Sequence, residues 1–125
     1  MNIIKEYVKS FAIIADDGST LAYRSNQHAV DICIKECHHE GKVATGRELS
    51  DKKFILRTDT YAHSLGHLRM LFDEAKKYFP SLKVDDVEVV KYAGYRYART
   101  MGIEFSSTAD APADFNLIDE VELTY

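Results

Sequence analysis

An apolar stripe between residues 61 and 79 constrains the fold more than any other feature of this sequence. Its members recur at intervals of three and four and are Tyr61, Leu65, Leu68, Phe72, Ala75 and Phe79. This spacing places them on one side of an α-helix. Pro80 cannot continue such a helix and predicts its end, and Thr58 or Asp59 is expected to cap its start. We therefore expect one long helix that buries this stripe in the core.

The segments before this helix predict a hairpin and a first helix. Residues 3–15 and 20–24 have strand character and flank the turn sequence Asp-Asp-Gly-Ser at 16–19. Asn26 is a good N-cap for a helix that ends near Glu40, with Gly41 as its stop. The expected core stripe of this helix is Ala29, Ile32, Cys33 and Cys37. Residues 42–51 are polar and predict a loop, and residues 53–57 predict a short strand or an extended lead-in.

Three further strands are expected after the long helix. Residues 86–92 and 95–105 predict two strands joined by a two-residue turn at Ala93 and Gly94, and residues 115–125 predict a last strand. Ile103 and Phe105 share the parity expected to face the helices. The opposite parity, which includes Gly102, is small and polar and predicts close approach of a ligand or another subunit. The element order predicts a single α+β domain over residues 1–125, an antiparallel sheet with two helices packed on one face.

Composition and charge narrow the class of partner. The hydrophobic content of 46% predicts a folded chain, and a net charge of −4 argues against a general grip on duplex nucleic acid. Residues 110–125 contain five acids and no base, whereas residues 91–99 contain three bases and no acid. No apolar run approaches the roughly 20 residues that cross a bilayer, and no signal peptide is evident. Two cysteines four residues apart favour a reducing, cytoplasmic location.

The candidate catalytic and metal-binding residues predict no reaction centre. His63 and His67 are four residues apart on the long helix, but no acidic general base stands between them. Cys37 and His38 are adjacent, and adjacent helix positions do not face each other. We therefore predict no catalytic residue, no metal and no cofactor, and the sequence favours a non-enzymatic role.

The arginines predict an anionic ligand. Arg24 and Arg57 each end a strand just before a helix, and helix N-termini attract anions. Arg96 and Arg99 lie in a tyrosine-rich strand that also contains Tyr95. Guanidinium groups pair with phosphates, and aromatic rings stack on bases, so this combination suits a nucleotide. Ordinary sheet architecture is the alternative explanation, because tyrosine favours strands and arginine protects strand edges.

The layout of these residues over residues 24–105 resembles a known phage family. Arg57 and Thr58 enter the long helix, Phe79 ends it, Arg96 and Arg99 follow on a C-terminal strand, and Arg24 precedes the first helix. This arrangement resembles the Thoeris anti-defence proteins of the first type, which sequester immune signals of the cyclic ADP-ribose type without cleaving them. The resemblance implies that arginines grip phosphates, that Phe79 or a tyrosine stacks on adenine, and that a homo-oligomer in the cytoplasm of a bacterial host builds the pocket between subunits.

We therefore expect a protein that sequesters a small anionic nucleotide signal, either of the cyclic ADP-ribose type or a cyclic oligonucleotide. The expected ligand-binding residues are Arg24, Arg57, Thr58, Phe79, Tyr95, Arg96 and Arg99. Two other functions stay open at this point. One is a protein–protein inhibitor of a host defence enzyme that acts through the acidic C-terminal strand. The other is a small hydrolase or nuclease that uses the histidines.

Overall fold

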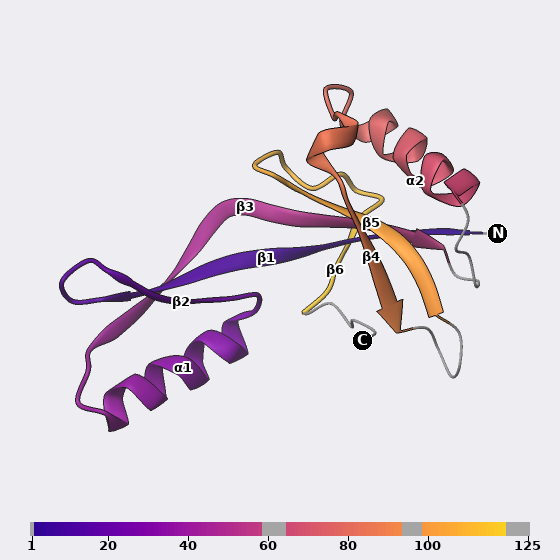
Figure 1. Cartoon of the computed structure of the whole chain (residues 1–125). Coiled ribbons are helices and arrows are strands. Elements are labelled where there is room, and N and C mark those ends of the chain that lie inside the picture. The colour runs from indigo at the N-terminus through magenta and orange to yellow at the C-terminus, as the bar shows by residue number, and fades with distance from the viewer. Residues whose placement is uncertain (1, 59–64, 94–98, 120–125) are drawn as a thin grey trace.

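A ribbon of two long strands forms the centre of the molecule. The computed structural model describes residues 2–58, 65–93 and 99–119. The two strands are β1 (Ile3–Ala15) and β3 (Ala44–Thr58). They pair antiparallel along their whole length, from Ile3 opposite Thr58 to Ala15 opposite Ala44. Figure 1 shows α1 and α2 at opposite ends of this ribbon.

The remaining elements attach to the two halves of the ribbon. One half carries β2 (Thr20–Arg24) and α1 (Gln27–His39). The other half carries α2 (Leu65–Tyr78), the short 3-10 helix η1 (Val84–Asp86), β4 (Glu88–Ala93), β5 (Arg99–Ser107) and β6 (Asn116–Leu117). The strand order is β2-β1-β3-β5-β4, and the pairs along this path are antiparallel, whereas β6 pairs parallel with β1. The predicted α+β fold with an antiparallel sheet is confirmed.

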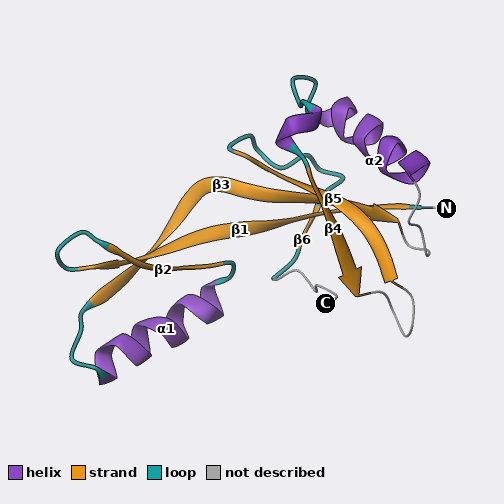
Figure 2. Cartoon of the chain, in the orientation of Figure 1, coloured by secondary structure: helices purple, strands orange, loops and turns teal. Residues whose placement is uncertain are grey.

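Both helices cover the same face of the ribbon. Tyr7 of β1 packs against the core that includes α2, whereas Phe11 and Ile13 pack against Val30 and Cys33 of α1. These three β1 residues have the same parity and therefore point to one face of the strand. In Figure 2 the helices nevertheless appear on opposite sides of the ribbon. The reason is that the ribbon twists between its two halves, as long strand pairs do.

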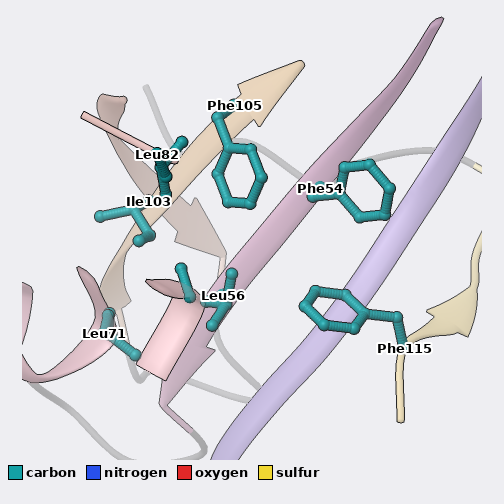
Figure 3. Close-up of a cluster of buried hydrophobic side chains, with 8 residues drawn as sticks. Phe54, Leu56, Leu71, Leu82, Ile103, Phe105 and Phe115 are labelled. Carbon is teal, nitrogen blue, oxygen red and sulfur yellow. The ribbon is translucent and has the colours of Figure 1, made fainter. Parts of the chain in front are cut away.

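The larger core lies between α2 and the sheet. Figure 3 shows its side chains converging from β3, β5, α2 and the segments next to α2 and β6. The ring of Phe54 has its centre 5.6 Å from that of Phe105 and 5.5 Å from that of Phe115. The buried members are Phe54, Leu56, Leu71, Ala75, Leu82, Ile103, Phe105 and Phe115. The predicted inward parity of Ile103 and Phe105 is confirmed.

A close approach of α1 to β3 explains one error in the sequence prediction. Residues 44–51 were expected to form a loop, but they belong to β3. A Cβ added at Gly46 would collide with Cγ1 of Val30, which is fully buried. Gly46 is therefore a strand residue that admits the helix, not a sign of a loop.

The helices also depart from the predicted stripes. Asn26 caps α1 as predicted, and Gly41 follows its end with φ of 77°. Ile32 of the expected stripe is 45% exposed. Leu65 at the start of α2 is 84% exposed, so it was also wrongly assigned to the core. Cys33 in α1 and Ala75 in α2 are buried as predicted, whereas the buried residues Val30 and Leu71 were not part of the predicted stripes.

Three strand boundaries differ from the prediction. Thr58 is the last residue of β3, and residues 59–64 lie outside the described part of the chain. Ala93 pairs with Arg99, so the two-residue turn predicted at Ala93 and Gly94 is wrong. Of the predicted last strand, β6 covers Asn116–Leu117, and residues 120–125 are not described. No helix in the described residues is long and apolar enough to cross a membrane.

Two leucines of α2 provide a matched test of the core. We expect Leu71→Ala to lower the free energy of unfolding by about 2–5 kcal/mol, because Leu71 is fully buried. Leu65→Ala removes the same atoms from an exposed site and should cost less than about 0.5 kcal/mol. Urea unfolding followed by circular dichroism measures both values. Equal losses in the two variants would contradict this packing.

Candidate anion-binding site

The two arginines predicted at helix starts lie at separate places along β1. Arg24 ends β2 opposite Phe11, whereas Arg57 in β3 stands opposite Ile4. The positions from residue 4 to residue 11 correspond to about 23 Å, at about 3.3 Å per strand residue. The structure therefore does not bring Arg24 and Arg57 to a common site within one chain.

Arg57 is held by partners inside the sheet. Its Nε donates a hydrogen bond to Oε1 of Glu6 at 3.1 Å. Its guanidinium carbon lies 5.8 Å from the centre of the Tyr92 ring, which is a favourable cation–π distance. Thr58, the next residue, is buried. Thr58 thus belongs to the interior of this half of the sheet, whereas Arg57 is partly buried and is paired with Glu6.

Tyr92 connects this arginine to a buried carboxylate. The Tyr92 hydroxyl donates to Oε2 of Glu104 at 2.5 Å, and Nζ of Lys53 lies 3.2 Å from Oε1 of the same group. Tyr92 is 2% exposed and Glu104 is 5% exposed. Burial, and then the hydrogen bond to Glu104, raise the pKa of Tyr92 above its ordinary value. Both oxygens of the buried carboxylate therefore have partners, which offsets the cost of removing it from water.

Gly102 makes room for the Tyr92 ring. A Cβ at this position would lie 2.6 Å from Cε2 of Tyr92 and 2.7 Å from the carbonyl oxygen of Leu56. Residue 102 therefore has to be small for the ring to lie across β5. The sequence predicted that a ligand or a second subunit would approach the backbone here. That prediction is wrong, because the tyrosine of the neighbouring strand occupies the space.

A positively charged pocket of about 510 Å³ lies between the start of α1 and the middle of the ribbon. It is lined by Val8, Lys9, Ser10, Tyr23, Arg24, Ser25, Asn26, Ala29, Asp51, Lys52, Lys53 and Ser106. Four of these side chains are cations and one is a carboxylate, so the pocket is positive in a chain whose net charge is −4. We call it the cationic pocket. Of the residues predicted to bind a ligand, it contains Arg24.

An irregularity in the pairing of β1 with β3 lies next to Lys9 and Lys52 of the cationic pocket. Between Lys9 and Phe11 of β1 the partner positions on β3 change from Lys52 to Glu48, so β3 contains extra residues there. Such a bulge bends a strand and redirects its side chains. Lys9 and Lys52 flank this point, and Asp51 lies within it. Lys9 is in turn held by Glu48, with Nζ 3.0 Å from Oε1.

The start of α1 forms one wall of the cationic pocket. The side-chain oxygen of Asn26 accepts a hydrogen bond from the backbone N–H of Ala29 at 2.8 Å. Ser25 Oγ donates to the carbonyl of Asp119 at 2.9 Å and thereby ties this wall to the C-terminal segment. Arg24 Nη1 donates to the carbonyl of the residue before it at 2.7 Å. The positive end of the helix dipole adds to the four cations.

A second pocket of about 460 Å³ adjoins the first and has the opposite charge. It lies at the edge of β5 where β4 begins, because Glu88, the first residue of β4, stands opposite Glu104. It is lined by Lys53, Phe79, Ser81, Leu82, Asp86, Glu88, Glu104, Phe105, Ser106 and Ser107. We call it the acidic pocket. The predicted residue Phe79 forms part of its wall, with its ring centre 4.7 Å from that of Phe54.

Three of the predicted site residues follow β4 in the sequence. Arg99 begins β5 opposite Ala93, whereas Tyr95 and Arg96 lie outside the described residues. His67 is on α2, and His63 is not described. Within residues 2–58, 65–93 and 99–119, no group of three or more His, Cys, Asp and Glu side chains is arranged to hold a metal ion.

The pocket lysines are the candidate binding residues that the sequence prediction missed. Lys52 and Lys53 precede the apolar run of β3, and adjacent strand residues point to opposite faces. Both still line the cationic pocket, because the β3 irregularity and the N-terminus of α1 lie beside them.

Comparison with known proteins identified no matching family model, curated protein or solved structure.

Replacing Tyr92 with phenylalanine tests the buried network. Tyr92→Phe leaves one oxygen of Glu104 without the hydroxyl partner, so we expect a loss of about 1–3 kcal/mol in unfolding free energy at pH 7. The raised pKa of Tyr92 means that the folded protein keeps this proton above pH 10, where an unfolded tyrosine loses it. The hydroxyl therefore stabilises the fold fully below about pH 10 and less as the pH rises further.

The two proteins should accordingly converge at high pH. Above pH 10 we expect the stability gap between the original protein and Tyr92→Phe to narrow by up to about 1.4 kcal/mol per pH unit. Urea unfolding at pH 7, 10 and 11 measures this gap. A gap that stays constant over this range would show that the Tyr92 proton is not linked to folding.

Proposed function

We propose that this protein is a non-enzymatic binder that sequesters a small anionic nucleotide signal in the cationic pocket. The observation that carries the proposal is the meeting of Lys9, Arg24, Lys52 and Lys53 beside the N-terminus of α1. Arginine and lysine donate to phosphate oxygens, and the helix terminus favours negative charge at the same place. The resemblance to the Thoeris anti-defence family supplies the ligand type, a cyclic ADP-ribose or a cyclic oligonucleotide, and the role in phage anti-defence.

The lining residues also suit a nucleotide in ways that go beyond charge. Tyr23 is exposed and supplies an aromatic ring for stacking. Ser10, Ser25 and Ser106 add hydroxyls that donate to and accept from a sugar. The volume of about 510 Å³ lies in the range of small-molecule sites.

The environment of Cys37 disfavours a cysteine nucleophile. Partial burial, and then the neighbouring Cys33, raise the pKa of the Cys37 thiol. A raised pKa reduces the thiolate fraction at neutral pH, and the thiolate is the nucleophile. This is the opposite of the environment that activates a catalytic cysteine beside a histidine such as His38.

Two arginine substitutions test the proposed ligand site. We expect Arg24→Ala to weaken binding of cyclic ADP-ribose or a cyclic dinucleotide at least tenfold, because a charged hydrogen bond to phosphate contributes about 1.5–3 kcal/mol. Arg47→Ala is the matched control, because Arg47 is an exposed arginine of β3 outside the pocket lining. It should change the affinity less than about twofold. Isothermal titration calorimetry measures both, and mass spectrometry of ligand released by heating should show it unaltered.

Three results would decide against this function. Failure to bind any cyclic ADP-ribose isomer or cyclic oligonucleotide would rule out this function. Recovery of a chemically altered ligand would favour a hydrolase or nuclease instead. Capture of a stoichiometric host protein that binds Arg24→Ala as well as the original protein would favour a protein inhibitor.

The proposed assembly is a homo-oligomer with sites between subunits. Arg24 and Arg57 are about 23 Å apart along β1. A ligand that uses both arginines therefore has to bind between two copies, as the family resemblance implies.

Sedimentation velocity tests this assembly. We expect a species of at least twice the chain mass of 14.2 kDa at micromolar concentration. We also expect added cyclic nucleotide to shift the distribution further toward the oligomer, because a ligand held by two subunits stabilises their association. A sedimenting mass equal to one chain, with and without ligand, would exclude shared sites.

A further inference from the structure

The cationic and acidic pockets meet at two shared residues. Lys53 and Ser106 line both of them. These residues stand opposite each other on β3 and β5, and Val8 stands opposite Lys53 on β1. The pockets therefore follow one row across the sheet, from β1 to the place where β4 begins. Strands lie about 4.8 Å apart, so this row is longer than a phosphate group.

The two pockets have opposite preferences for the parts of a ligand. The cationic pocket has four cations and one carboxylate, whereas the acidic pocket has Asp86, Glu88 and Glu104 against Lys53 alone. A phosphate is attracted to the first and repelled by the second. Carboxylates accept hydrogen bonds from sugar hydroxyls and from the amino groups of bases. The acidic pocket therefore suits the uncharged, donor-rich part of a molecule whose anionic part lies in the cationic pocket.

We infer that the ligand is a nucleoside phosphate that spans both pockets in one orientation, with its phosphates beside Arg24 and its sugar or base donors beside Glu88. This inference rests on the proposed function and specifies the chemistry at each end. Lys53 stands at the junction, where its Nζ is 3.2 Å from Glu104 Oε1. It neutralises the nearest carboxylate on one side and contacts the phosphates on the other. Glu88 is exposed, so it is available to a ligand without disturbing the core.

Two probes separate the ends of this ligand. Inorganic pyrophosphate carries the anionic part alone, and ADP carries the same part joined to a ribose and a base. By calorimetry, we expect the protein to bind ADP at least tenfold more tightly than pyrophosphate. Glu88→Gln should weaken ADP binding at least fivefold and leave pyrophosphate binding within about twofold. Arg24→Ala should weaken both probes.

The sign of the Glu88→Gln effect makes the experiment decisive. Removal of a carboxylate that only contributes long-range repulsion would strengthen the binding of both anions. Glu36→Gln is the matched control, because Glu36 is an exposed glutamate of α1 outside both pockets. It should have little effect on either probe.

Each outcome has a separate meaning. If Glu88→Gln leaves ADP binding unchanged or strengthens it while Arg24→Ala still weakens it, the spanning orientation is overturned and the anion-binding function survives. Equal affinity for ADP and pyrophosphate overturns the orientation in the same way. If neither ADP nor pyrophosphate binds, this inference is also overturned. The proposed function is tested separately, by the binding of cyclic nucleotides.

Discussion

The antiparallel pairing of β1 with β3 is the interaction on which every other part of the structure depends. β1 pairs with β2 at one end and with β6 near the other, and β3 carries β5. Both cores form on the same face of this pair. A register shift of β1 by one residue would turn Tyr7 and Phe11 away from the helices and expose them. The packing of α1 at one end and α2 at the other therefore fixes the register of the whole ribbon from both sides.

The twist of the same ribbon creates the candidate site. Without twist, two helices on one face would leave the other face flat and open to solvent. The twist instead carries the N-terminus of α1 round to the side of the ribbon that α2 leaves uncovered, as Figure 2 shows. The β3 irregularity opposite Ser10 then places Lys9 and Lys52 at this junction. The cationic pocket is thus a product of tertiary geometry, since its lining combines short segments from β1, β2, α1, β3 and β5.

Local signals were sufficient to predict β1, β2 and the presence of both helices, but not the full extent of β3 or the contacts between elements. Asn26 and Gly41 mark the ends of α1 through side-chain and backbone preferences that need no partner. Gly46 was taken as a loop signal and Gly102 as an opening for a ligand, because a sequence does not show which neighbour fills the space above a glycine. Val30 and the Tyr92 ring fill these two spaces. Leu65 was wrongly placed in the core for a related reason, since periodicity identifies an apolar stripe but not where the packing partner ends. The pocket lysines were missed because their convergence depends on the twist.

The cationic pocket also shows why the net charge of −4 is a poor guide to the ligand. At physiological ionic strength, charges are screened over about 8 Å, so distant acids have little effect on the pocket. Asp51 is the one carboxylate in the pocket lining, and Glu48 and Glu104 pair with Lys9 and Lys53 from outside it. An ion pair as exposed as that of Lys9 contributes about 0–1 kcal/mol to the free energy of unfolding. It therefore orients the ammonium group of Lys9 and leaves that group able to bind a further anion. Glu104 differs because it is buried and also accepts from Tyr92. The carboxylate that positions Lys53 is thereby fixed by the sheet itself, and this links the pocket to the packing of β4 on β5.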